Sequence, residues 1–416
     1  MKYKLLTLLL TTQILNAQKS NDDLLEDLKN QFQYMKMDSV NELNKGKNYS
    51  FYKSVYQNVI NNPEESLKLL TKKNNKHLKN TYQYVKLIND NASKLFDYKS
   101  AYESSLAITT NFKDKLTEKE LEDEINNLRI WEVLKNKPKQ TISTYTEEII
   151  QTKRDIAGLL TLEVINKDYK SDYVFDTGAG LNCITTTEAQ KLGIEILPDN
   201  NIEIQSFTGQ LNKVRIGIAK SLNIGNITIK NAVFLVYPDS AFSFAGGQYK
   251  INGIFGFPIA KDLGTLTFED NSINIKKGGK KTNNPKNFFI DHLRPIIMVK
   301  YKGKTLPNNF DSGASSSLFN KKFYETYKDY IDQNATSEIS KHAGAGAEIY
   351  EDEVKLLSDE TIIIGDKKVK LSEMKIDPIN YGVFGKENYG NIGQDVLKQF
   401  RKVTMSFEEN YLLLEN

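Results

Sequence analysis

Two aspartates in this chain stand in nearly the same five-residue setting, F-D-T-G-A around Asp176 and F-D-S-G-A around Asp311. Two carboxyl groups held about 3 Å apart cannot both ionise readily, so they share one proton. The ionised carboxylate can then take a proton from water, while the protonated carboxyl polarises a carbonyl group. Because Asp, Thr and Gly are also ordinary turn residues, one D-T-G alone does not distinguish a reactive carboxylate from a turn.

The residues that follow each aspartate repeat the same landmarks. Gly209 follows Asp176 by 33 residues, and Gly344 follows Asp311 by 33 residues. Further along, N-G-I-F-G-F in the first copy corresponds to Y-G-N-I-G-Q in the second, with the final glycines at offsets of 80 and 82. Two aligned copies with matching landmarks favour a functional pair of carboxylates over two unrelated turns.

Short strands and one helix in each copy must position the aspartates. From about residue 150 onwards, runs rich in β-branched and aromatic residues alternate with turn residues, which is typical of a mainly β structure. A helix is predicted after each motif. In the first copy Thr185 and Glu188 have the spacing of a capping box and Gly193 ends the helix, while Asn320 caps the second helix.

The segment before the β region reads as helical. Tyr52, Val55, Tyr56 and Val59 fall on one helical face, and similar stripes continue to about residue 145. The pattern predicts antiparallel helix pairs with a faint resemblance to tetratricopeptide repeats. A packed structural domain, a partner-binding domain and a pro-segment all fit this pattern.

The N-terminus has the layout of a secretory signal peptide. Lys2 and Lys4 precede the apolar run from Leu5 to Leu15, and Ala17 is a small residue at the expected cleavage point. The run is too short to span a bilayer, and no later segment is apolar enough to do so. We expect a chain exported by a cleaved signal peptide without a transmembrane anchor, periplasmic or secreted if the source is bacterial.

Composition argues against several other functions. The net charge of +3, with interspersed acidic and basic residues, gives no indication of a nucleic-acid partner. The single cysteine, Cys183, excludes an intramolecular disulfide and is expected to be a buried core residue. His77, His292 and His342 are far apart in the sequence and have no metal-ligand spacing. The sequence therefore gives little support to a Ser–His or Cys–His catalytic site or to a histidine-rich metal site.

The repeated unit resembles a lobe of the retropepsin-like aspartic proteases. That family combines Asp-Thr/Ser-Gly-Ala, a glycine-tipped flap hairpin and an apolar-apolar-glycine turn, and the resemblance covers about 260 of the 416 residues. It implies two retropepsin-type lobes fused in one chain, as in pepsin-like proteases. The expected fold is α+β and multidomain, an all-α helical-hairpin domain followed by a mainly β bilobal aspartic-protease fold. The expected segments are a signal peptide (1–17), the helical domain (18–148), lobe 1 (149–275), a linker (276–291) and lobe 2 (292–416).

The resemblance also implies roles for individual residues. Asp176 and Asp311 would be catalytic, acting on an extended peptide or unfolded protein without a cofactor or metal. The supporting residues would be Thr177, Gly178, Ala179, Ser312, Gly313 and Ala314, with the two hydroxyls bridging the lobes. The flaps would include Ser206, Phe207, Thr208 and Gly209 in lobe 1, and His342, Ala343 and Gly344 in lobe 2.

Three departures from the family pattern stand out. Alanine follows each D-[ST]-G, where pepsin-type sequences often have a hydroxyl that stabilises the ionised carboxylate, so we expect a weakly acidic optimum. The flap tyrosine of pepsins is missing, and Asn391 is polar where the family has an apolar residue. The leading hypothesis is an exported aspartic endopeptidase. The alternative is a non-catalytic peptide-binding or interaction protein that retains the fold.

Overall fold

The computed structural model describes residues 49–206, 209–278, 281–284, 286–347, 349–380 and 388–416. The predicted signal peptide and two predicted flap residues, Phe207 and Thr208, lie outside the described residues. The described chain forms a helical region followed by a mainly β region, which confirms the predicted fold class. Within the described residues, no helix is both long and apolar enough to cross a lipid bilayer.

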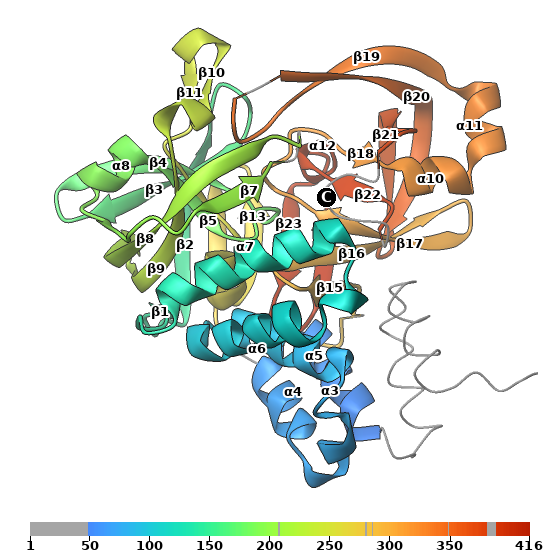
Figure 1. The fold of residues 1–416 in the computed structure, drawn as a ribbon. Helices are drawn as coiled ribbons and strands as arrows, with labels where there is room; N and C mark the ends of the chain where they lie inside the picture. The colour runs from blue at the N-terminus through green and yellow to red at the C-terminus, as the bar shows by residue number, and fades with distance from the viewer. Residues whose placement is uncertain (1–48, 207–208, 279–280, 285, 348, 381–387) are drawn as a thin grey trace, which may run out of the picture.

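The helical region consists of antiparallel neighbours with two short 3-10 turns, Lys73–Leu78 and Lys113–Lys115. Its helices are α3 (Tyr49–Val59), α4 (Pro63–Leu70), α5 (Tyr82–Lys94), α6 (Tyr98–Asn111) and α7 (Glu118–Leu134). All four residues of the predicted stripe in α3 are buried, because a helical period of 3.6 places them on one face. Figure 1 shows α3–α6 grouped at one end of the molecule, with α7 between them and the strands.

Lobe 1 is built from the strands β1 to β14. Their bounds are β1 (Thr141–Ile142), β2 (Glu147–Arg154), β3 (Leu160–Asn166), β4 (Tyr169–Phe175), β5 (Asn182–Thr185), β6 (Glu195–Ile196), β7 (Ile202–Gln205), β8 (Leu211–Ile224), β9 (Ile227–Tyr237), β10 (Ser243–Phe244), β11 (Tyr249–Lys250), β12 (Gly253–Phe255), β13 (Thr265–Glu269) and β14 (Ser272–Lys276). Two short α-helices, α8 (Thr186–Lys191) and α9 (Phe257–Ala260), follow β5 and β12. The short β1 pairs with β9, so the chain joins this sheet before the predicted boundary at 148.

Lobe 2 repeats this plan with the strands β15 to β24. They are β15 (Phe288–Asp291), β16 (Arg294–Tyr301), β17 (Lys304–Phe310), β18 (Leu318–Phe319), β19 (Thr336–Ala343), β20 (Ile349–Ile364), β21 (Lys367–Ile376), β22 (Gly390–Ile392), β23 (Lys402–Ser406) and β24 (Tyr411–Glu415), with helices α10 (Lys321–Thr326), α11 (Lys328–Asn334) and α12 (Gln394–Leu397). Because β15 begins at Phe288, the segment between the lobes is shorter than the predicted linker.

The last strands of the two lobes pair with each other. The antiparallel pairing of β13 with β23 places Leu266 opposite Met405 and Phe268 opposite Val403. The shared sheet has the order β24-β23-β13-β14-β2, so its strands come from both lobes. Apolar residues of both lobes form one continuous buried cluster across this junction. The lobes are therefore joined by backbone hydrogen bonds as well as by core packing.

The predicted caps are partly correct. The Thr185 hydroxyl accepts a hydrogen bond from the Glu188 amide, and Asn320 accepts from the amides at the start of α10. The reciprocal half of the capping box is wrong: the buried Glu188 carboxylate accepts instead from the Tyr169 hydroxyl at 2.7 Å. Gly193 ends α8 with a positive φ of 64°, as its position predicts.

Candidate active site

Each aspartate begins a loop directly after a strand of its own lobe. Asp176 follows β4, and its amide donates to the Phe255 carbonyl at 2.9 Å. Asp311 follows β17, and its amide donates to the Ile392 carbonyl at 2.9 Å. In both lobes the strand before the aspartate pairs in parallel with the short strand of the glycine turn, β12 or β22. The two copies of the sequence repeat therefore have the same backbone pairing around the aspartate.

Polar side chains that the sequence analysis did not single out anchor these glycine turns. The Gly256 amide donates to the Asn182 Oδ1 atom at 2.9 Å. At the corresponding place in lobe 2, the Gly393 amide donates to the Ser317 Oγ atom at 3.0 Å. Asn182 and Ser317 each stand six residues after the aspartate of their lobe, so the offset used for the repeat could have found them.

The two aspartate loops are joined by a reciprocal set of hydrogen bonds. The Thr177 amide donates to Ser312 Oγ at 3.0 Å, and the Ser312 amide donates to Thr177 Oγ1 at 3.1 Å. The hydroxyls in turn donate to the carbonyls before the opposite aspartate, Thr177 to Phe310 and Ser312 to Phe175, at 2.9 and 2.7 Å. Both side chains are fully buried. This arrangement fixes the two loops relative to each other.

The glycines of the two motifs let the carboxyls approach across the lobe boundary. A Cβ atom on Gly178 would lie 2.5 Å from the carboxyl carbon of Asp311, and one on Gly313 would lie 2.2 Å from that of Asp176. Real Cβ atoms do not tolerate such contacts, so only glycine fits at either position. Each carboxyl is thus seated directly against the backbone of the opposite lobe.

The electrostatics of the pair follow from this proximity. Burial raises the pKa of Asp176 well above its usual range, and the charge of Asp311 and a hydrogen bond between the two carboxyls raise it further. Hydrogen bonds from the Gly178 and Ala179 amides to Asp176 Oδ1, at 2.8 and 3.1 Å, oppose this rise only in part. A raised pKa beside a second carboxyl is the condition under which two acids share one proton.

The surroundings of the two carboxyls differ. The Gly313 amide donates to Asp311 Oδ1 at 2.9 Å, which matches Gly178 in lobe 1. In addition, the Asn391 side-chain amide donates to Asp311 Oδ2 at 2.8 Å. The predicted supporting residue Ala314 donates its amide to the Asp311 carbonyl at 3.3 Å rather than to the carboxylate. The polar residue noted as a departure from the family pattern is therefore a direct partner of one aspartate.

The first predicted flap is the hairpin of β7 and β8. Its turn is closed by hydrogen bonds from the Ser206 amide to the Gln210 carbonyl and from the Gly209 amide to the Ser206 carbonyl, at 2.8 and 2.9 Å. Gly209 has a φ of 87°, a left-handed conformation that favours glycine.

The second predicted flap is the hairpin of β19 and β20. His342 and Ala343 lie in β19, opposite Tyr350 and Ile349, and not in the turn itself. Gly344 begins the turn and accepts from the Ala347 amide at 3.1 Å, while Gly346 has the positive φ of 106°. Matching offsets pointed to Gly344, but the residues of this turn with positive φ are Gly346 and Ala347, at 106° and 58°.

The two flap tips touch. The Gly346 amide donates to the Ala241 carbonyl in lobe 1 at 2.8 Å, and the Asn212 side chain donates to the Ala345 carbonyl at 3.2 Å. Gln210 and Asn212 side chains leave no room for a Cβ atom on Gly346. The second hairpin thus reaches across to the first, and Figure 1 shows β19 and β20 arching over the top of lobe 2 toward lobe 1.

Helix α7 supports the outer edge of the first flap. The Glu203 amide of β7 donates to Asn126 Oδ1 at 3.1 Å. Next to this contact, Asn200 donates to the Arg129 carbonyl at 2.9 Å and Arg129 donates to the Asn201 carbonyl at 2.8 Å. The helical region is therefore attached to the hairpin that the sequence analysis predicted as the first flap.

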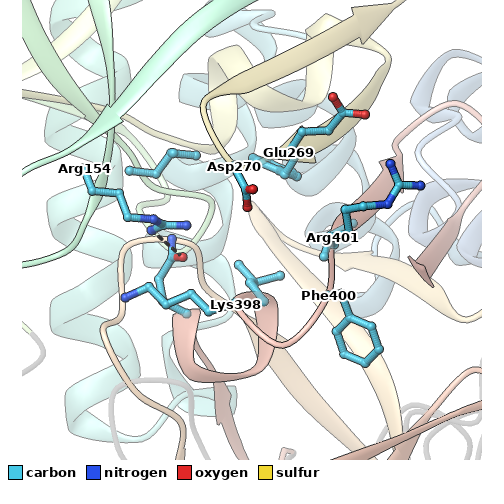
Figure 2. A pocket seen from close by; sticks show the side chains of 11 residues that line it. Arg154, Glu269, Asp270, Lys398, Phe400 and Arg401 are labelled. Atoms are coloured by element: carbon cyan, nitrogen blue, oxygen red, sulfur yellow. Dashed lines mark hydrogen bonds between the residues drawn. The ribbon is translucent and has the colours of Figure 1, made fainter. Parts of the chain in front are cut away.

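A small cavity of about 100 Å³ lies behind the Asp311 loop. Figure 2 shows Arg154, Asp270, Lys398 and Arg401 around it. Arg154 donates to Gln394 Oε1 at 3.0 Å, and the buried Gln394 amide donates to the Ser312 carbonyl at 2.6 Å. This chain of contacts braces the loop from the side away from the carboxyls.

Among the described residues, no group of three or more His, Cys, Asp or Glu side chains is arranged to hold a metal ion. Cys183 is buried beside Asp176, where burial and the aspartate charge raise the pKa of its thiol. The site is thus described by two carboxyls, main-chain amides and one side-chain amide.

Comparisons with known proteins give one family match, which lies within lobe 1. Residues 161–259 match the family model described as aspartyl protease. No curated protein sequence matches the chain. Among solved structures, conglutin gamma, a basic 7S globulin from lupine seeds, is 7% identical with a TM-score of 0.41, covering 65% of this chain and 94% of that one. Basic 7S globulin from soybean is 9% identical with a TM-score of 0.42, covering 65% and 95%.

Proposed function

We propose that this protein is an aspartic endopeptidase that hydrolyses peptide bonds with a water molecule activated between Asp176 and Asp311. The observation that carries this proposal is the carboxyl pair itself. The two acids come from different lobes, each lies against the glycine of the other lobe, and the neighbouring carboxyl of Asp311 adds to the rise in the pKa of Asp176. The aspartyl protease match over residues 161–259 supports the same function.

The chemistry follows from a pair that holds one proton. The ionised carboxylate takes a proton from water as the water oxygen attacks the peptide carbonyl carbon, and the protonated carboxyl gives its proton to the carbonyl oxygen. The resulting tetrahedral diol collapses when the amide nitrogen receives a proton from one carboxyl, the C–N bond breaks, and a hydroxyl of the diol gives its proton to the other carboxylate. The products are a carboxyl and an amine, and the pair again holds one proton.

The two hairpins indicate the kind of substrate. An extended peptide can add to hairpin edges through main-chain hydrogen bonds. Because the flap tips contact each other, we propose that they part to admit the peptide and close again over it. Closure would exclude bulk water and hold the scissile bond against the carboxyls.

The test uses the full-length chain and an unfolded protein labelled for fluorescence, assayed between about pH 3 and pH 7. Wild type should cleave it and be blocked by a statine-type inhibitor, whose hydroxyl takes the place of the attacking water. Asp176→Asn and Asp311→Asn should each lose about 1,000-fold or more in kcat/KM, because catalytic groups that act as a unit fail together. Asp366→Asn, at a side chain that is 84% exposed, is the control and should keep wild-type activity.

One outcome would replace the proposal with the alternative. If wild type binds peptides over this pH range but cleaves none, the chain is a non-catalytic peptide-binding protein with the same fold. If both Asn variants retain cleavage, the activity belongs to another site or to a contaminant. The first outcome is recognised because wild type cleaves no substrate, and the second because wild type and both Asn variants cleave it.

We also propose that residues 1–17 are a cleaved signal peptide and that the mature chain is exported, to the periplasm or the medium if the source is bacterial. N-terminal sequencing of the protein recovered from the culture would test this. The helical region is proposed as a partner-binding or pro-segment domain as well as a structural one. Full activity of the intact chain would argue against a pro-segment.

A further inference from the structure

The two lobes differ at one position beside the carboxyls. In lobe 1, Ile254 of β12 pairs with Val174 and Cys183. Asn391 takes the same place in β22, pairing with the strand before Asp311 and with the strand after it. The register therefore makes Ile254 and Asn391 equivalent, so an apolar side chain in one lobe is replaced by an amide in the other.

This replacement changes how the carboxyl oxygens are bonded. Asp311 accepts at both oxygens, from the Gly313 amide at Oδ1 and from the Asn391 amide at Oδ2. Both main-chain donors to Asp176 reach the same oxygen, Oδ1, which leaves its Oδ2 atom as the oxygen that can carry a proton. An N–H donor to a carboxyl oxygen favours the ionised form of that carboxyl.

The orientation of the Asn391 amide points the same way. Its Nδ2 atom donates to Asp311, while its buried Oδ1 atom has no hydrogen-bond partner among the described residues. Were Asp311 protonated at Oδ2, the favourable orientation would be the reverse one, with the amide oxygen accepting that proton. The orientation in the structure is the one that suits an ionised Asp311.

We propose that Asn391 is a positioning residue that makes Asp311 the ionised member of the pair, and hence the general base, while Asp176 keeps the shared proton. This inference rests on the proposed function, because it assigns roles within the proposed reaction. Main-chain amides give Asp176 two donors, both at Oδ1, and give Asp311 only one, so the Asn391 side chain supplies the second donor to Asp311 and is the one that occupies its second oxygen.

Few other charges face the pair. The Cys183 thiol of β5 lies near Asp176 and is itself close to the Tyr237 hydroxyl of β9. On the lobe 2 side, Arg154 is separated from Asp311 by Gln394 and the Ser312 loop. Of the side chains described here, Asn391 alone donates a hydrogen bond to either carboxylate from outside the two D-[ST]-G-A motifs.

The test is the pH dependence of kcat/KM in Asn391→Leu, which restores the apolar character of Ile254. Loss of the donor should raise the apparent pKa of the acidic limb by about one unit, because a hydrogen bond to a charged group is removed. Asn391→Ala also removes the donor and should shift the acidic limb in the same direction. It serves as the test variant if the leucine variant folds poorly. The exchange Ile254→Asn/Asn391→Ile should return the limb toward its wild-type position, with the donor now beside Asp176.

A second measurement separates this inference from the proposed function. The carboxyl carbons of ¹³C-labelled aspartate are titrated by NMR, with Asp176→Asn and Asp311→Asn used for assignment. The Asp176 signal should titrate above the usual aspartate range in wild type, and it should move downward in Asn391→Leu as the shared proton is drawn toward the other carboxyl. An unmoved titration, or a uniform fall in kcat/KM without a shift of the limb, would overturn the role of Asn391. A wild type that titrates as expected but cleaves nothing would overturn the proposed function alone.

Discussion

Thr177 and Ser312, 135 residues apart in the chain, each accept a main-chain hydrogen bond from the other residue. Each hydroxyl also donates to a carbonyl of the opposite lobe, so four bonds tie the two aspartate loops together. These four hydrogen bonds hold the two aspartate loops at a fixed separation, although none of them involves a carboxyl group.

Replacing Thr177 with valine should destabilise the protein by about 2 kcal/mol, because the buried Ser312 amide and the Phe310 carbonyl lose their partners. Activity should fall about 100-fold as the loops lose their alignment. Thr177→Ser is the matched control, since serine already serves in lobe 2, and it should stay within about 1 kcal/mol of wild type. In a double-mutant cycle with Ser312→Ala, simple additivity of the unfolding free energies would contradict the reciprocal contact.

Gly313→Ala should abolish most activity, because its Cβ atom would meet the Asp176 carboxyl carbon at 2.2 Å. We expect a loss of about 100-fold or more in kcat/KM, measured on the fluorescent substrate. The control is Gly180→Ala in the same region, where the nearest atom would be 3.9 Å away and no strained φ is present. If Gly180→Ala lost as much activity as Gly313→Ala, the contact with the Asp176 carboxyl would not be the cause of the loss.

The buried ion pair between Asp90 and Lys94 should make the junction of α5 with lobe 2 sensitive to acid. Lys94 Nζ lies 3.1 Å from Asp90 and 3.3 Å from the Ile290 carbonyl of lobe 2, and its side chain is fully buried. Burial alone would raise the pKa of Asp90, but the charge of Lys94 and the ring of His292 outweigh it and hold the pKa well below the usual range. A lowered pKa contributes stability that is fully present above the unfolded value of about 3.9, and this contribution is lost progressively as the pH falls from that value through the lower folded pKa.

Asp90→Asn should therefore cost about 3 kcal/mol at pH 7, because Lys94 keeps its charge without a counter-ion. The difference from wild type should shrink below about pH 4. Urea unfolding followed by circular dichroism at pH 7, about pH 4 and about pH 2 measures this, with all variants made in the Asp176→Asn background to prevent self-cleavage. A difference that stays constant down to about pH 2 would mean that the charge of Asp90 does not stabilise the fold.

The contact of α7 with the first flap should affect substrate binding more than turnover. Among the described strands β7 pairs only with β8, so its outer edge depends on the Asn126 acceptor. Asn126→Leu should speed hydrogen exchange of the Glu203 amide and raise KM several-fold. Asn126→Asp keeps an acceptor oxygen and should behave like wild type. Unchanged exchange in the leucine variant would show that α7 does not hold the flap edge.

The sequence could lead to the two aspartates because their motif is local and occurs twice. The repeat offsets also pointed to both hairpins, since a fixed spacing survives when the loops between strands keep their lengths. The same offsets missed the tip of the second hairpin by two residues, because the turn after Ala343 closes at Gly344 and Ala347 and leaves Gly346 in the left-handed conformation.

Contacts between distant segments could not be predicted from the sequence. Asn391 was visible only as a polar residue at an apolar position, and its bond to Asp311 depends on the register of β22 between β17 and β18. Asp90 and Lys94 read as an ordinary i,i+4 pair on a helix surface. Only the docking of α5 on lobe 2 buries them, and nothing in the helical period reveals which surface will cover it.

The pairing of β13 with β23 also has a consequence for the order of events during synthesis. At about 5–20 residues per second, a ribosome reaches Asp311 about 7 to 27 seconds after Asp176, and β23 later still. β23 belongs to the lobe that carries Asp311 and joins that lobe to β13, so the growing chain holds one carboxyl with no counterpart until much of the second lobe has been made. We infer that a partly made chain lacks the proposed activity, because the proposed site needs a carboxyl from each lobe.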